Sequence, residues 1–254
     1  MPATPSLDSV VSWIDAYLKI RELPDHDGAV NGLQVENGGS ITRVLAAVDA
    51  SIDSIAAAGR QRGTLLLVHH GLFWGDERSV TGRRYRRLKT ALDGDVAVYS
   101  AHLPLDAHPE VGNNILLAQL LGLAVSGPFG RYKDLDVGLH GVLEKDRSAL
   151  TRELSHLLGH PARLIPGGPE WTKRVAIITG GAGSSVTEAS ARGCDTFITG
   201  EGAHHTWFDA MEGGVNLIYA GHWATETLGV KALAERVGKT FEIPWEFFAQ
   251  PTGL

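Results

Sequence analysis

The chain has 254 residues, of which 43% are hydrophobic and 20% charged, with a net charge of −6 and one cysteine. This is the composition of an ordinary globular protein; the charge disfavours a general nucleic-acid-binding surface, and one cysteine excludes an internal disulfide or a thiolate-rich metal site. No apolar run approaches the ~20 residues that cross a bilayer, and the first residues lack a secretory signal, so we expect a cytoplasmic protein without a membrane segment.

Strands and helices alternate in the first part of the chain. Ser6 is the expected N-cap of the first helix, and turn residues precede a short extended segment at 33–35. Asp49 either caps a helix, the interpretation we favour, or serves as a site acid. Apolar periodicity predicts helices at 7–18, 51–58, 83–92 and 113–121, and buried strands at 44–48, 65–68 and 96–99.

Gly127-Pro128 is predicted to be a linker, after which the pattern begins again. The second part is predicted to contain strands at 137–143, 175–178, 196–199 and 215–219, and helices at 148–158, up to 192, at 204–211 and at 225–237. This alternation favours an α/β architecture with largely parallel pairing. We therefore expect a first lobe at 1–126, completed by 229–254, and a second lobe at 127–228.

Two adjacent histidines follow one of the buried strands. His69 and His70 come directly after the apolar run 65–68, and Gly71 allows a sharp turn behind them. Ligands of open α/β sheets bind at the carboxyl ends of strands. Because neighbouring side chains of an extended chain point different ways, the pair suits two metal ions better than one. The alternative is a pair that is satisfied by ordinary hydrogen bonds.

Two further strand ends supply matching ligand types. His102 and Asp106 follow the strand at 96–99, and His222 and Glu226 lie four residues apart on one face of the last helix. Imidazoles together with carboxylates suit zinc, iron, manganese or similar divalent ions. Taken singly, Asp106 is equally explained as a turn or cap residue, and Glu226 as an acid favoured by the helix dipole. The whole set favours a dinuclear metal centre.

Three other features each have two interpretations. The loop 199–205 contains Glu201 and two histidines, which are either partners of a metal site or surface residues at a helix start. The glycines within 180–183 lack the spacing of a dinucleotide or P-loop motif, so a tight turn is favoured over phosphate binding. The basic cluster 83–89 is either a solvated helix face, the simpler interpretation, or an anion-attracting pocket rim.

Together these residues resemble the Nif-three-like dinuclear-metal-centre proteins, which are commonly labelled GTP cyclohydrolase type-2 homologues. The resemblance extends from about Asn31 to the last helix. It is carried by four motifs in combination: Val68–Trp74, Ala101–Asp106, Thr199–Glu201 and Gly221–Glu226.

The resemblance implies a two-lobed α/β fold, a toroidal homohexamer and two divalent metal ions per chain. It assigns metal ligation to residues from both parts of the sequence, namely His69, His70, Asp106, His222 and Glu226. Glu226 resembles the bridging ligand, and His102 and Glu201 map beside the metal pair. Because the ligands come from both halves, the site is expected in a cleft between the two lobes.

The leading functional hypothesis is a metal-dependent hydrolase of a small anionic, nucleotide-like substrate. In this hypothesis a water shared by the metal ions attacks, His102 or Glu201 transfers protons, and the basic cluster 83–89 attracts the substrate. The rival hypothesis is a non-catalytic protein that binds or delivers metal, or that scaffolds a partner. A hydrolase requires an open coordination position, whereas a storage protein does not.

Overall fold

The computed structural model describes residues 4–75 and 79–254, and it divides into two compact units. The first unit comprises Met1–Leu105 with Gly229–Gln250, and the second comprises Asp106–Leu228 with Pro251–Leu254. The first division therefore lies after Leu105, whereas the sequence analysis places it after residue 126. The reason is helix α5 (Asn113–Leu121), which packs its apolar side chains into the core of the second unit.

The first unit is built on a mostly parallel sheet with the strand order β1-β4-β3-β2-β11. Only the short β1 runs antiparallel to its neighbour, among the strands that the structure describes. The strands are β1 (Gly32–Val35), β2 (Arg43–Asp49), β3 (Thr64–His70), β4 (Val96–Ser100) and β11 (Trp245–Phe247). The helices are α1 (Leu7–Leu18), α2 (Ile52–Ala58), α3 (Gly82–Asp93), α4 (Leu103–Asp106) and the C-terminal part of α9 (His222–Phe241).

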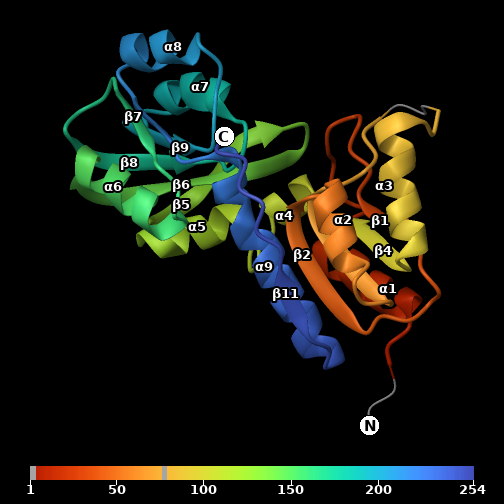
Figure 1. Cartoon of the computed structure of the whole chain (residues 1–254). Coiled ribbons are helices and arrows are strands. Elements are labelled where there is room, and N and C mark those ends of the chain that lie inside the picture. The colour runs from red at the N-terminus through yellow and green to blue at the C-terminus, as the bar shows by residue number, and fades with distance from the viewer. Residues whose placement is uncertain (1–3, 76–78) are drawn as a thin grey trace. The chain divides into compact units, whose positions relative to one another are not determined.

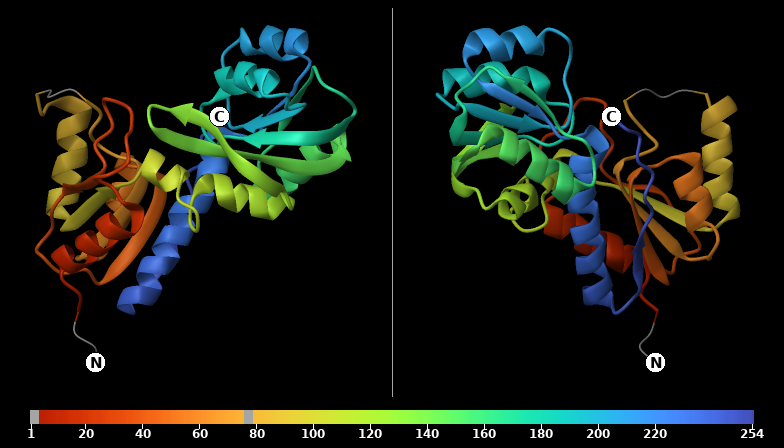
Figure 2. Two further views of the ribbon diagram at one scale, coloured as in Figure 1. Left: turned by 180° about the vertical axis from the view of Figure 1, so that it is seen from behind. Right: turned by 60° about the vertical axis from the view of Figure 1, so that its left-hand side comes forward.

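Different helices cover the two faces of the first sheet. Leu66 of β3 and Val98 of β4 pack in one buried cluster with Ile55 of α2. The next residue of β4, Tyr99, points to the opposite face, where its hydroxyl donates to Asp15 of α1 at 2.7 Å. Figure 2 shows α1 and the C-terminal part of α9 on that face, and α2 and α3 on the other. Both faces are therefore covered, which explains the continuous apolar runs of the central strands.

The second unit has a mixed sheet with the strand order β5-β6-β8-β9-β10-β7. Helices α5 and α6 cover one face and α7 and α8 lie on the other (Figure 1). The strands are β5 (Ala124–Tyr132), β6 (Leu135–Asp146), β7 (Arg163–Pro166), β8 (Trp171–Ile177), β9 (Thr196–Thr199) and β10 (Asn216–Tyr219). The helical segments are α6 (Arg147–Leu158), the short η1 (Gly183–Ser185), α7 (Val186–Ala191), α8 (Thr206–Gly213) and the start of α9.

The predicted linker at Gly127-Pro128 is wrong, because both residues lie inside β5 and pair with His140 and Leu139 of β6. Proline lacks the N–H group that a central strand needs for its second neighbour. Here β5 is an edge strand, and its register shifts between Val125 and Gly127, so proline is tolerated. Proline was therefore a sign of an edge strand and not of a domain boundary.

The α/β class is confirmed, since each unit combines a sheet with helices on both faces. Parallel pairing holds for β2, β3, β4 and β11 and for β8, β9 and β10, whereas β5, β6 and β7 pair antiparallel. In the described ranges no helix combines the length and the apolar character needed to cross a membrane.

Candidate metal centre

Parallel strands of the first unit bring several polar side chains to one edge of its sheet. β3 extends through both His69 and His70, beyond the predicted end of the strand. In the register between β2 and β3, Asp49 lies opposite His70. β4 ends at Ser100, shortly before His102. Because these strands are parallel, their carboxyl ends and the side chains that follow them share an edge.

Each of the three imidazoles at this edge is oriented by a hydrogen bond at its Nδ1 atom. His69, which is fully buried, donates to a backbone carbonyl oxygen at 2.8 Å. His70 lies 2.9 Å from a carboxylate oxygen of Asp49, and His102 lies 2.8 Å from one of Asp25. Such a bond fixes the ring and its tautomer, so that Nε2 is the nitrogen that would bind a metal ion or accept a proton.

The three histidines also converge on one another. His69, His70 and His102 each offer a ligand atom, and these atoms lie within 4.8 Å of one another. The ring centroid of His102 is 4.9 Å from that of His69 and 5.7 Å from that of His70. Oriented imidazoles at this spacing fit an ion such as zinc or iron. His102, which the resemblance places beside the metals, is thus part of the same group as His69 and His70.

Asp25 orients His102 and is itself firmly held. Its carboxylate accepts hydrogen bonds from the Asn31 side chain at 2.8 Å and from the backbone N–H groups of His26 and Leu103 at 2.6 and 3.0 Å. Burial by itself raises the pKa of Asp25, but the bonds from His102, Asn31 and His26 outweigh burial and lower this pKa below its ordinary value. Asp25 is therefore a carboxylate that fixes the orientation and the tautomer of His102.

In the second unit, His222 and Glu226 face each other across the first turn of α9. The Nε2 atom of His222 is 3.1 Å from Oε1 of Glu226, and its Nδ1 atom is 2.8 Å from Oε1 of Glu201. Burial lowers the pKa of His222, but the bonds and charges of Glu226 and Glu201 outweigh burial and raise it to about 9. Two carboxylates thus attract a cation here, and a metal ion must displace this proton to bind the imidazole.

Glycine lets the backbone pass close to this pair. Gly180 follows the end of β8 with a φ of 73°, and a Cβ atom at this position would overlap the carboxylate of Glu226. Its N–H group donates to the hydroxyl of Thr225 at 3.1 Å. The glycines within 180–183 therefore form a tight turn against the carboxylate, as favoured from the sequence. A phosphate is not expected where a buried carboxylate already lies.

Asp106 is buried beside the same turn. Its Oδ1 atom accepts from the side chain of Asn113 at 2.8 Å and from the hydroxyl of Thr179 at 3.3 Å. Thr179 directly precedes Gly180, so the turn connects Asp106 to the surroundings of Glu226. In the part of the chain that is described, Asp106 does not belong to the group of three histidines.

The loop that follows β9 contains one partner of a candidate metal ligand and two surface histidines. Glu201 is a partner of His222, as described above. His204 and His205 are exposed at the start of α8, where the ring of His204 lies edge-on to Phe208 with centroids 5.7 Å apart. Only Glu201 therefore has the position of a residue that supports a metal ligand.

Sequence reasoning missed one carboxylate of the site, Asp25, and favoured the wrong interpretation of another, Asp49. Asp49 was favoured as a helix cap, but Ser51 caps α2 by accepting from the backbone N–H of Ser54, and Asp49 orients His70 instead. Its position at a strand end was the available signal. Asp25 lies in a segment whose residues predict only a turn, and its hydrogen-bond partner His102 is 77 positions away in the sequence. No local pattern marks such a contact.

Comparison with known proteins places these residues in a family context. A family model described as Duf34/NIF3 (NGG1p interacting factor 3) matches residues 5–252. A protein of Deinococcus radiodurans named "GTP cyclohydrolase 1 type 2 homolog" is 42% identical over 249 residues, which cover 97% of this chain and 94% of that protein. A protein of the same name from Pyrococcus abyssi is 41% identical over 97% of this chain and 99% of its own.

Solved structures show the same fold over nearly the whole chain. The structural-genomics protein ybgI, of unknown function, has a TM-score of 0.92 and 34% identity and covers 98% of this chain and 100% of its own. The protein TTHA1606 from Thermus thermophilus has a TM-score of 0.89 and 39% identity, with the same coverage of 98% and 100%.

Proposed function

The chain belongs to the Duf34/NIF3 family, and on this basis we propose that it is a metal-dependent hydrolase of a small anionic, nucleotide-like substrate. The observation that carries the proposal is the group formed by His69, His70 and His102, whose ligand atoms lie within 4.8 Å of one another and whose Nδ1 atoms are all engaged. Imidazoles arranged only for packing have no need of three separate orienting acceptors. A metal centre requires them.

The proposed centre contains two divalent ions, as the resemblance implies. The ligands that the resemblance implies are His69, His70, Asp106, His222 and Glu226. Such a set of imidazoles and carboxylates suits zinc, iron or manganese. When bound, these ions would polarise a carbonyl or phosphoryl oxygen and acidify water.

Two further residues support the proposed reaction. His102, paired with Asp25, has the arrangement of a general base and the carboxylate that orients it, and it would move a proton at its Nε2 atom. Glu201 contacts His222 and would act by orienting this imidazole. We therefore assign proton transfer to His102 and a positioning role to Glu201.

We expect hydrolytic activity to depend on bound metal. The experiment purifies the full chain without chelator, quantifies its metals, and screens nucleotides that include GTP together with phosphoesters. An activity that chelation removes and one divalent ion restores is the expected result. A fully metal-loaded protein that hydrolyses nothing in the screen would favour the rival function, which is metal binding, metal delivery or the scaffolding of a partner.

We also propose that the chain assembles into a closed homohexamer, as the resemblance implies. An exposed apolar patch on α8 supports an association surface, because the side chains of Trp207, Phe208 and Met211 are 42%, 46% and 38% exposed. Multi-angle light scattering at micromolar concentration is expected to give a single species near six times 27.2 kDa. A monodisperse monomer would contradict this prediction.

The contribution of the patch to assembly can be tested separately. The double substitution Trp207→Ser with Phe208→Ser is expected to reduce the particle mass. Trp171→Ser is the matched control, because Trp171 is 65% exposed but lies on β8, outside the patch. If both variants keep the mass of the wild type, α8 does not form the contact.

A further inference from the structure

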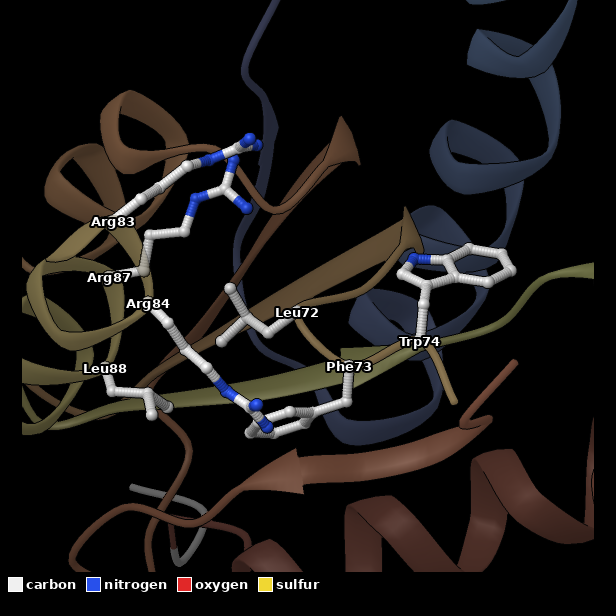
Figure 3. Close-up of a pocket in the computed structure, with 7 residues that line it drawn as sticks. All are labelled: Leu72, Phe73, Trp74, Arg83, Arg84, Arg87 and Leu88. Atoms are coloured by element: carbon white, nitrogen blue, oxygen red, sulfur yellow. The ribbon is translucent and has the colours of Figure 1, made fainter. Parts of the chain in front are cut away.

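A second feature of the first unit is a pocket of about 380 Å³ between α3 and the loop that follows β3. Its lining combines apolar and basic side chains, as Figure 3 shows: Leu72, Phe73, Trp74, Arg83, Arg84 and Arg87. The sequence analysis left open whether the basic cluster 83–89 forms a solvated helix face or a pocket rim. The structure places three of its arginines on the pocket.

Two of these arginines bring like charges together. Arg83 and Arg87 are one helical turn apart on α3, and Figure 3 shows their guanidinium groups side by side above Leu72. Partial burial lowers the pKa of Arg87, and the charge of Arg83 lowers it further, whereas Asp49 opposes this effect. Like charges at this spacing destabilise a helix, so the pair does not serve the stability of α3. A bound anion would relieve the repulsion.

The third arginine and the aromatic residues shape the remainder of the pocket. The guanidinium carbon of Arg84 lies 5.0 Å from the ring centroid of Phe73, in a cation–π contact that closes one wall. Trp74 is 42% exposed and leaves an aromatic surface open at the opposite wall. Aromatic surfaces of this kind stack on nucleobases, as they do in single-stranded nucleic acid complexes.

Two contacts connect residues around the pocket to the group of three histidines. The indole of Trp74 lies edge-on to the ring of His102, with centroids 5.0 Å apart and an interplanar angle of 83°. Asp49, which interacts electrostatically with Arg87, also holds His70 at 2.9 Å. Residues that line or face the pocket therefore adjoin the imidazoles of the candidate metal centre.

We propose that this pocket binds the phosphate group of a nucleoside phosphate through Arg83 and Arg87, with Trp74 stacking on the base. The proposal rests on the proposed function for the role of this ligand as a substrate, but the binding itself does not. Planar guanidinium groups match phosphate with two parallel hydrogen bonds each, and a pair of them suits a dianion. The ligand class is a small phosphorylated compound that carries an aromatic ring.

Isothermal titration calorimetry on the full-length protein, as purified and after chelation, tests the proposal with GMP, guanosine and ribose 5-phosphate as probes. We expect Arg87→Gln and Arg83→Gln each to weaken GMP binding at least tenfold in both preparations. Arg86→Gln is the matched control, because it removes the same charge from α3 at an exposed position outside the pocket. This variant is expected to bind GMP within about twofold of the wild type, as for a surface charge.

The three probes separate the two parts of the proposed contact. Trp74→Ala is expected to weaken the binding of GMP and guanosine and to leave ribose 5-phosphate binding unchanged. Arg87→Gln is expected to weaken the binding of GMP and ribose 5-phosphate and to leave guanosine binding unchanged. Wild-type protein that binds no probe, or Arg83 and Arg87 variants that bind like the wild type, would overturn the proposal. An equal loss of GMP affinity in Arg86→Gln would also overturn the proposal, since the loss would then come from the overall positive charge of α3 and not from the pocket.

The outcome is independent of whether the protein proves to be a hydrolase. If binding depends on Arg83 and Arg87 but the metal-loaded chain hydrolyses nothing, the pocket is established and the proposed function fails. If hydrolysis is found and KM is unchanged in both arginine variants, the hydrolase stands and the pocket assignment fails.

Discussion

Glu226→Gln is expected to lower the metal content of the purified protein from about two ions per chain to less than one. The substitution preserves the size of the side chain and removes its charge. Glu226 is only 3% exposed, and its carboxylate lies 3.1 Å from Nε2 of His222. Solvent water therefore cannot take the place of the lost negative charge. A neutral amide is also a poorer ligand for a divalent ion, and it cannot bridge two ions as a carboxylate does.

Elemental analysis of protein purified without chelator provides the measurement. His69→Ala is expected to lose less metal than Glu226→Gln, because it removes one terminal imidazole. Glu212→Gln is the matched control, an exposed acid on α8 of the same unit, and it is expected to keep the full load. Circular dichroism of each variant after chelation verifies the fold. If Glu226→Gln and His69→Ala both retain the wild-type metal content, the ligand assignment is wrong.

His102→Ala is expected to lower turnover by about 10²–10⁴-fold while the metal content stays close to that of the wild type. His102 is oriented by Asp25 at 2.8 Å, and its side chain is 13% exposed, so its imidazole is both positioned and shielded. A base of this kind contributes to the chemical step, and the loss is therefore expected in kcat, with KM changed little.

The same experiment distinguishes a base from a ligand. Because His102 lies in one group with His69 and His70, metal must be quantified together with turnover. A parallel loss of metal and activity would show that His102 is a ligand. Asp25→Asn should disturb the tautomer of His102 and reduce activity by roughly 10–100-fold. His26→Ala is the control, since it removes an exposed imidazole whose centroid lies 5.6 Å from that of His102.

The central strands and their polar ends were readable from the sequence. The runs at 44–48, 65–68 and 96–99 are entirely apolar or small, and the structure makes each a strand that is covered on both faces. Burial on two faces demands such continuous runs, so composition alone identifies the strands. The positions of His69, His70 and His102 at one sheet edge then followed from parallel pairing.

Tertiary contacts decided what local patterns left open. Pro128 was read as a break because the sequence does not state which strand lies at an edge, and only the sheet order shows that β5 needs no second partner. Helix α5 was assigned to the first lobe by its position in the chain, but the apolar side chains of Leu117 and Leu121 are buried with Val175 and Ile177 of β8. Sequence proximity does not determine which core a helix completes.

The ligand types were determined by the sequence, whereas their supporting contacts were determined by the fold. His222 and Glu226 share a helix face because residues four apart always do. Asp25 and Asp49 hold their histidines across 77 and 21 positions, distances over which hydrophobic periodicity carries no information. The arginines at 83 and 87 were visible as charges, but whether they faced solvent or a pocket depended on the loop that packs against α3. Long-range packing therefore converts a list of candidate ligands into oriented groups.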